Sequence, residues 1–470
     1  MNKSDNSSQQ VVEFYAKHEK IYPRAVSGLF ARLRVAGVLS LLGLYYGLPW
    51  LRWDDRQAVL LDLPARQFHI FGLTFFPQDF FYLAVLLIIA GIALFFFTTL
   101  AGRLWCGYAC PQTVWTEVFM WIERRIEGDR PKQMKLDRAP WTPRKLAIKT
   151  TKHAVWILFS LWTGYTFVGY FTPITELAVK LFSFSTGPWE TFWVLFYGAA
   201  TYLNAGWMRE QVCIYMCPYA RFQSAMFDEN TLVISYDAKR GEPRGSRKRG
   251  VDPKEVGLGD CVDCTLCVQV CPTGIDIRDG LQYQCIGCAA CIDVCNEVME
   301  KMGYPKGLIR YTTENAMEGK PTRILRPRIF IYIALLSTIT IALVHALVTR
   351  IPLELDVIRD RNALYRELPN GEIENSYALK IINMDTRAHT YTVQVSGLPG
   401  VHFAREHVSI TVPAGGVETL PVRVRIDRSA IRAPRLTLEF LVRARDDRRL
   451  RVSEHGRFLA PAASPPGSPE

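Results

Sequence analysis

The sequence predicts a multi-domain membrane protein built from a bundle of five transmembrane helices, a cysteine-rich α+β insertion and a C-terminal all-β sandwich. Three observations carry this prediction. Five apolar blocks approach the roughly 20 residues needed to cross a hydrocarbon core, eight cysteines form two equally spaced runs before the fifth block, and short strand-like segments follow it. The 470 residues, 49% of them hydrophobic, leave room for several folding units.

The apolar blocks predict five helices that span a membrane. They lie at residues 33–51, 80–100, 154–173, 190–208 and 329–348. The first block follows a polar segment, 1–32, and no small-residue cleavage motif comes after it, so it is not expected to be a cleaved signal peptide. Residues 33–208 are therefore predicted to hold the first four helices.

Basic residues between the blocks predict the orientation. The loop after the second block carries eleven arginines and lysines, whereas the loop between the third and fourth blocks has only Lys180. Because positively charged loops stay in the cytoplasm, the N-terminus and residues 209–328 are predicted to be cytoplasmic and everything after the fifth block periplasmic. The formal charge of +11 then reflects topology signals and contacts with anionic lipids of the membrane, and no nucleic-acid partner is expected.

Two runs of cysteines between residues 209 and 328 share the spacing C-x2-C-x2-C-x3-C. Four thiolates hold a cubane iron–sulfur cluster, and in two-cluster ferredoxins the fourth cysteine of each run binds the other cluster. We therefore predict a dicluster ferredoxin domain with two [4Fe-4S] clusters. The predicted ligands are Cys261, Cys264, Cys267 and Cys295 for the first cluster, and Cys271, Cys285, Cys288 and Cys291 for the second.

Zinc sites and disulfides are the alternatives for these eight cysteines. Zinc sites usually pair two cysteine knuckles across a longer gap, and disulfides are disfavoured in a cytoplasmic segment. The second run ends in Cys295-Asn296 instead of Cys-Pro, which leaves all four thiols in place. Residues 237–253, rich in glycine, proline and basic side chains, are predicted to be a mobile linker before the cysteine runs.

The region after the fifth block changes character. Segments such as TYTVQVSGL and LTLEFLVRA within 352–458 alternate apolar and polar residues or end at turn signals. Short strands at this spacing predict an antiparallel sandwich of immunoglobulin type. No catalytic constellation occurs there, so a binding or docking role is expected, and residues 459–470 are predicted to be a disordered tail.

A repeated hexapeptide, C-x-Y-x-C-P, follows the second and fourth apolar blocks at Cys106–Pro111 and Cys213–Pro218. Cysteines four apart on a helix share one face, and the proline should kink or end the helix. If the two spans are adjacent, the thiols of Cys106, Cys110, Cys213 and Cys217 converge. Four soft thiolates favour Cu(I), zinc or a further iron–sulfur centre; the alternative is that small cysteines merely pack helix ends.

Two other cofactors are not expected. His153 and His345 lie toward opposite ends of their spans, so a bis-histidine haem is improbable, and no glycine-rich nucleotide loop stands between a strand and a helix. Hydride chemistry would have to come from a partner.

Several segments together closely resemble the FixG/CcoG-type cytochrome c oxidase accessory proteins. These segments are IYPRAVSGLFARLR, GRLWCGYACPQTVWTE, CIYMCPYARFQ, the eight-cysteine array and the C-terminal sandwich. The resemblance runs from about Tyr22 to the end of the sandwich. The cysteine array alone is shared by many redox proteins, whereas the combination is specific.

The resemblance implies a multi-pass protein of the bacterial inner membrane that reduces Cu(II) to Cu(I) for assembly of cbb3-type cytochrome c oxidase. It implies cluster ligation by the eight ferredoxin cysteines and a catalytic, copper-facing role for Cys106, Cys110, Cys213 and Cys217. Expected partners are oxidase assembly factors, copper chaperones or a copper transporter, and an unidentified cytoplasmic electron donor. The rival functions are a quinol-linked respiratory conduit, resembling the membrane ferredoxins of nitrate reductase systems, and a non-catalytic redox-sensing scaffold.

Overall fold

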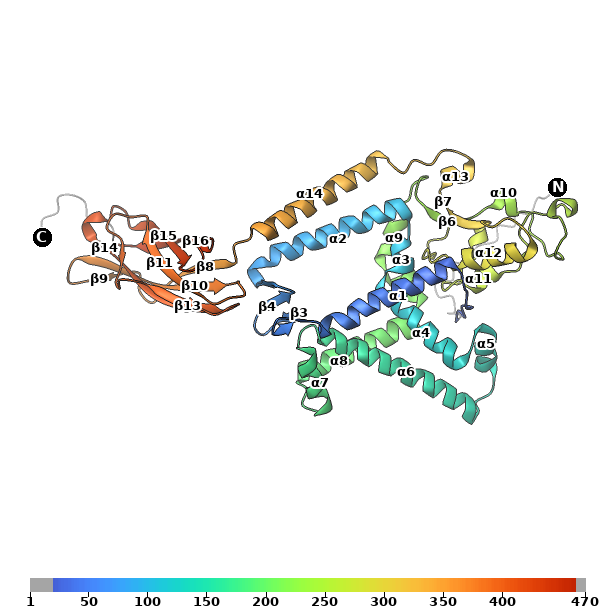
Figure 1. Ribbon diagram of the computed structural model, residues 1–470, viewed down its shortest axis with the longest axis horizontal. Helices are drawn as coiled ribbons and strands as arrows, with labels where there is room; N and C mark the ends of the chain where they lie inside the picture. Colours follow the sequence, from blue (N-terminus) through green and yellow to red (C-terminus); the bar gives the residue numbers. More distant parts are fainter. Residues whose placement is uncertain (1–19, 462–470) are drawn as a thin grey trace, which may run out of the picture. The chain divides into compact units, whose positions relative to one another are not determined.

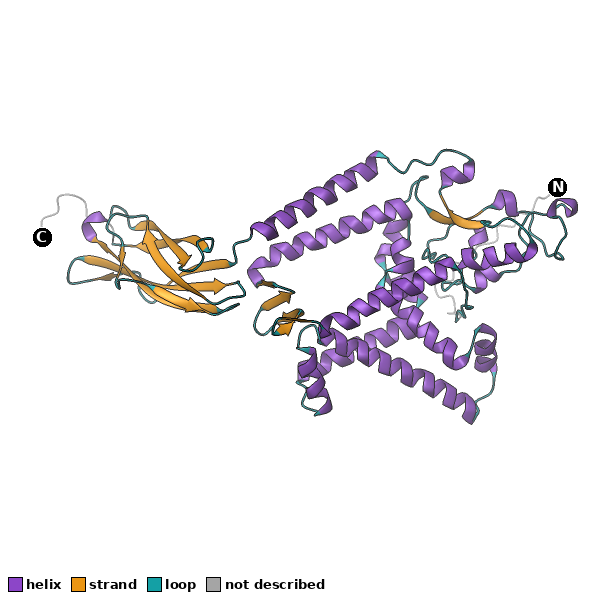
Figure 2. Ribbon diagram, in the orientation of Figure 1, coloured by secondary structure: helices purple, strands orange, loops and turns teal. Residues whose placement is uncertain are grey.

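The computed structural model describes residues 20–461, which form two compact units built from segments far apart in the sequence. Of the described residues, the first unit takes 20–48, Ile89–Gly169 and Ile174–Leu336, and the second takes Pro49–Ile88, Tyr170–Pro173 and 337–461. Most of the tail predicted to be disordered lies outside the described residues. Helices dominate the first unit and strands the second (Figure 2).

Proline starts several helices of the first unit. It occupies the first helical position of α4, α6, α8 and α9, where its missing N–H leaves no hydrogen bond unmade. The helices between the N-terminal segment and the cysteine runs, with the last long helix, are α1 (Leu29–Gly47), α2 (Phe80–Ala101), α3 (Leu104–Tyr108), α4 (Pro111–Glu127), α5 (Arg130–Arg138), α6 (Pro143–Val168), α7 (Ile174–Phe182), α8 (Pro188–Thr201), α9 (Pro218–Ser224) and α14 (Pro327–Thr349).

Three of the five predicted spans are confirmed as helices long and apolar enough to cross a membrane. These are Leu29–Trp50, Pro77–Ala101 and Pro327–Thr349. The predicted third span corresponds to α6, which starts earlier than expected, among basic residues, and ends at Val168. The predicted fourth span corresponds to α8, whose 14 residues continue into a π-helical turn, Tyr202–Met208. A membrane crossing by these two helices stays a prediction.

The α6 and α8 helices pack with their backbones in contact. A Cβ atom on Gly164 would lie only 2.2 Å from the carbonyl oxygen of Val194, and one on Gly198 would lie 3.4 Å from the carbonyl oxygen of Ser160. Small residues allow this close approach, which is how helices commonly associate in membranes.

The cysteine runs fold into a small α+β domain beside the N-terminal end of α1 (Figure 1). Its strands β6 (Val233–Tyr236) and β7 (Ile309–Thr312) pair antiparallel. Its helices are α10 (Ala238–Gly241), α11 (Leu266–Gln269), α12 (Ala290–Met302) and α13 (Glu314–Glu318). Ile234, Met299 and Leu308 are almost fully buried in its core.

The prediction of a mobile linker at 237–253 is wrong. The segment packs on the domain that follows it: the Gly245 N–H donates to the carbonyl oxygen of Cys261 (3.2 Å), and the Arg247 guanidinium donates to the hydroxyl of Tyr304 (2.9 Å). Composition alone does not reveal these long-range partners.

The predicted immunoglobulin-like sandwich is confirmed in the second unit. One sheet has the order β12-β14-β10-β8, with β9 pairing β10, and the other β13-β11-β15-β16. Tyr391, Phe440 and Phe458 are fully buried between them. The strands are β8 (Leu353–Arg359), β9 (Arg366–Glu367), β10 (Glu372–Asn383), β11 (His389–Ser396), β12 (His402–Phe403), β13 (Ser409–Val412), β14 (Val417–Asp427), β15 (Arg435–Ala444) and β16 (Arg451–Leu459).

A second, smaller sheet occupies the loop between the first two spans. It consists of β3 (Val59–Asp62), β4 (Gln67–Ile70) and β5 (Leu73–Phe75), preceded by the short pair β1 (Arg52–Trp53) and β2 (Arg56–Gln57). The Gln67 side chain donates to the carbonyl oxygen of Gly415 (2.6 Å), so this sheet contacts the sandwich. The sequence reading assigned no structure to this loop.

Candidate functional site

The eight ferredoxin cysteines line two small apolar cavities. Cys261, Cys264, Cys267 and Cys295 line one of them, together with Val298 and Leu308 among others. Cys271, Cys285, Cys288 and Cys291 line the other, with Ile275 and Ile277, and Cys267 also reaches it. The structure thus brings together the two sets of four thiols that the spacing rule predicts.

The two cysteine loops, residues 261–267 (the first) and 285–291 (the second), adopt the same backbone conformation. Asp263 and Thr265 of the first loop have positive φ angles of 52° and 57°, and the equivalent Gly287 and Ala289 of the second have 69° and 59°. Non-glycine residues adopt this left-handed conformation rarely. Its recurrence at three non-glycine positions indicates backbone shaped around a bound group.

The donor set fits an iron–sulfur cluster. Burial raises the pKa of Cys267 to about 11 and that of Cys295 to about 12, so both are neutral thiols near pH 7 unless a cation binds. Ferric and ferrous ions supply that positive charge and bind cysteine as the thiolate. A cubane also suits thiols spread around a cavity, because each cysteine binds a different corner.

The second cysteine loop is held tightly against the helices that follow α2. The buried Arg103 guanidinium donates to the carbonyl oxygens of Cys285 (2.9 Å) and Ala220 (2.8 Å). A Cβ atom on Gly107 of α3 would lie 2.7 Å from the carbonyl oxygen of Gly287, so only glycine allows this approach. The ferredoxin domain is therefore docked by backbone contact at the cluster loop itself.

Both hexapeptides break their helix between the two cysteines. Cys106 lies on α3, which ends at Tyr108, and Cys110 caps the N-terminus of α4. In the second copy, Cys213 lies in a π-helical turn, and Cys217 caps α9. The expectation that each pair shares one helical face is wrong, because the proline after the second cysteine starts a new helix.

The four hexapeptide thiols nevertheless influence one another electrostatically. Burial, and then the neighbouring thiol of Cys110, raises the pKa of Cys106 to about 12, and Cys213 and Cys217 add to this shift. Among the described residues, however, no three His, Cys, Asp or Glu side chains close around a single ion. Convergence of the four thiols on a common metal therefore stays a prediction.

Two of these thiols also pack against buried side chains around a cluster ligand. Cys106 and Cys213 pack against a buried cluster of side chains that includes Ile286 and Cys288. Cys106 Sγ also donates to Oε1 of the fully buried Gln223 (3.6 Å). The hexapeptides and the cluster ligands thus form one continuous sulfur-rich region.

The sequence did not indicate a buried ionic group that involves Arg209, four residues before the second hexapeptide. Glu123 of α4, 2% exposed, accepts from the guanidinium of Arg209 (2.7 Å) and lies 3.3 Å from the ammonium of Lys152. Burial disfavours the carboxylate, but Arg209, Lys20 and Lys152 outweigh this and lower the pKa of Glu123 to about 2. Some basic residues that were interpreted only as topology signals, such as Lys152, therefore also form buried ion pairs.

Family models match three regions of the chain. The 4Fe-4S dicluster domain matches residues 208–314, a 4Fe-4S binding domain matches 83–128, and the IG-like fold at the C-terminus of FixG matches 343–461. The nitrogen fixation protein FixG of Rhizobium meliloti is 40% identical over 422 residues, which cover 82% of this chain and 80% of FixG. The chain belongs to the FixG family.

A second relative and one solved structure are also similar to this chain. Protein RdxB of Cereibacter sphaeroides is 44% identical over 436 residues, covering 89% of this chain and 90% of RdxB. The crystal structure of a FixG-related protein from Vibrio parahaemolyticus covers 23% of this chain and 95% of its own, at 30% identity and a TM-score of 0.21. This member of the FixG family is an iron–sulfur membrane protein with the features of an oxidoreductase.

Proposed function

We propose that this protein carries single electrons from a cytoplasmic donor, through two [4Fe-4S] clusters, to Cu(II) at the hexapeptide thiols, and so supplies Cu(I) for assembly of cbb3-type cytochrome c oxidase. In this proposal the ferredoxin domain is cytoplasmic and the sandwich periplasmic. The observation that carries it is the packing of Cys106 and Cys213 against the buried cluster of side chains that includes Cys288.

The exposure of the ligands supports this direction of electron flow. Cys264 of the first set is exposed, whereas Cys288 of the second set is buried against the hexapeptides. A soluble donor can therefore approach the first set, and the second set lies nearer the thiols. Each Cu(II) takes one electron to become Cu(I), and thiolates favour the Cu(I) product.

Copper reduction can be tested on anaerobic, detergent-purified protein with reduced clusters. Addition of Cu(II) with a Cu(I)-specific chelator should reoxidise the clusters and yield one Cu(I) per electron lost. Cys106→Ser and Cys213→Ser should abolish this reaction and leave both cluster signals intact. Tyr215→Phe, a change of an exposed side chain in the same motif, is the matched control. Reoxidation by a quinone analogue with copper inert would contradict the proposal and favour a respiratory conduit.

A further iron–sulfur centre is the second candidate for the hexapeptide thiols. The 4Fe-4S binding domain model matches residues 83–128, where Cys106 and Cys110 are the only cysteines. Iron analysis separates the two proposals, because two cubanes hold about eight iron atoms per chain and three hold about twelve. Loss of about four iron atoms in Cys106→Ser would favour the further cluster.

A further inference from the structure

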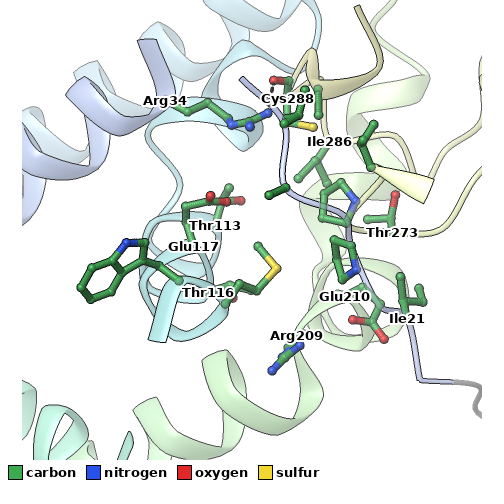
Figure 3. Close-up of a pocket in the computed structure, with 18 of the residues that line it drawn as sticks. Ile21, Arg34, Thr113, Thr116, Glu117, Arg209, Glu210, Thr273, Ile286 and Cys288 are labelled. Carbon is green, nitrogen blue, oxygen red and sulfur yellow. Dashed lines mark hydrogen bonds between the residues drawn. The ribbon is translucent and has the colours of Figure 1, made fainter. Parts of the chain in front are cut away.

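A cavity of about 420 Å³ lies between α4, the segment before α1 and the second cysteine loop (Figure 3). It is lined by the cluster ligand Cys288 and also by Cys213 of the second hexapeptide. Its volume falls within the range of roughly 300–1,000 Å³ typical of small-molecule sites. The proposed electron path does not require this space.

The lining of the cavity is more basic than acidic. Its charged residues are Arg24, Arg34, Arg124, Arg125 and Arg209 against Glu117, Asp129 and Glu210. Arg124 pairs with Glu117 (3.2 Å) and Arg209 with Glu123 (2.7 Å), whereas Arg24, Arg34 and Arg125 form no ion pair with any described residue. This excess of positive charge favours an anion and disfavours a bare copper ion.

Arg34 presents a hydrogen-bond donor without a partner. Its Nη1 donates to the carbonyl oxygen of Cys288 (2.8 Å), while its Nε is buried and has no partner among the described residues. In Figure 3, Arg34 and Cys288 lie together on one side of the cavity, and Arg209 and Glu210 lie on the other. A buried N–H left unpaired is energetically unfavourable, so this guanidinium is available to bind an acceptor.

The remaining walls suit a flat apolar body. Val26, Val270 and Ile286 line the cavity, and so does Trp121, whose ring lies 5.4 Å from the guanidinium carbon of Arg125. Aromatic rings stack on indole and guanidinium planes. An anionic group near Arg34 and a ring along these walls would occupy both kinds of surface.

We propose that this cavity binds an aromatic phosphate, a ring system that carries a phosphate group, of which flavin mononucleotide and nucleoside monophosphates are the available kinds. The phosphate accepts hydrogen bonds from Arg34, and the ring packs beside Trp121. Because the binding involves no electron transfer, it holds or fails independently of copper reduction.

Equilibrium dialysis of the purified holoprotein tests the proposal with three probes: flavin mononucleotide, adenosine monophosphate and inorganic phosphate. We expect one saturable site for at least one aromatic phosphate, with inorganic phosphate a weak competitor. Arg34→Gln should weaken binding about tenfold or more, the loss expected for one charge-assisted hydrogen bond. Arg32→Gln, on the same helix but outside the cavity lining, is the matched control and should bind normally.

Arg125→Gln is a second test in case Arg34→Gln does not fold. Arg125 is exposed and stacks on Trp121, so its replacement should leave the fold intact. It should weaken binding without changing the cluster absorbance. Binding should also perturb the paramagnetic signal of the second cluster, since the cavity reaches Cys288. No saturable binding of either aromatic phosphate, or binding that Arg34→Gln, Arg125→Gln and Arg32→Gln leave equally strong, would overturn the proposal.

Discussion

Gly107→Ala tests the docking of the ferredoxin domain most directly. The added methyl carbon would lie 2.7 Å from the carbonyl oxygen of Gly287 and 3.0 Å from that of Ile286, where ordinary contacts begin near 3.4 Å. Both neighbours are backbone atoms that no side-chain rotation can move. Relief therefore requires α3 and the loop to separate by about 0.7 Å at the closest contact.

Overpacking of this kind costs roughly 1–3 kcal/mol, which corresponds to about a 5- to 150-fold shift of the docking equilibrium. We expect faster hydrogen exchange in residues 283–290 and slower reoxidation of the clusters by Cu(II), with both clusters still assembled. Gly91→Ala is the matched control, because a Cβ atom there meets nothing within 4 Å. Hydrogen exchange in Gly107→Ala equal to that of the control would refute the inferred contact, whatever the copper result.

Three further predictions concern the ionic groups and one ligand. Glu123→Gln should lower the free energy of unfolding by about 3–5 kcal/mol, the cost of breaking a buried ion pair. The control, Glu176→Gln, removes an exposed ion pair and should change the free energy of unfolding little. Calorimetry of the two variants measures the difference. Because the pKa of Glu123 is lowered to about 2, its contribution should be present above the unfolded-state pKa near 4.3 and fade as the pH falls toward 2. Burial lowers the pKa of His389, but its hydrogen bonds to Asp385 and Asp446 outweigh this and raise that pKa. Its stabilisation of the sandwich should therefore be full below about pH 6.5 and be lost as the pH rises through the higher pKa of the folded state. Hydrogen exchange of β11 as a function of pH should show this dependence, and His389→Gln should abolish it. Cys264→Ser should alter one paramagnetic cluster signal and spare the other, and loss of both in a folded protein would contradict two separate ligand sets.

The elements that could be predicted depend on local patterns. The ligand sets follow from a fixed spacing, because a loop of two residues between cysteines allows few geometries, and the sandwich follows from alternation along each strand. The confirmed spans are long and mostly apolar, with Arg32 and Arg34 near the start of the first. By contrast α6 begins among basic residues, so a hydropathy pattern places its start too late.

The arrangement of the site could not be predicted because it depends on contacts across large separations in the chain. Nothing near Gly107 in the sequence shows that Gly287 will touch it, and Arg103 is indistinguishable from other basic residues of its loop until its carbonyl partners are known. Arg209, likewise, has a positive φ of 42° and donates to the distant, buried Glu123, neither of which the local sequence indicates. The proline of each hexapeptide predicted a helix break, but not that the break falls between the two cysteines.

The carboxylate of Asp293 links the cysteine-bearing helix α12 to the first membrane helix, α1. It accepts from the backbone N–H groups of Phe30 (3.3 Å) and Ala31 (2.7 Å) at the start of α1, and it lies on α12 between Cys291 and Cys295. This carboxylate therefore couples α12 to the start of the first membrane helix, so that order in one favours order in the other. By linkage, a chain without its clusters should hold this helix less firmly.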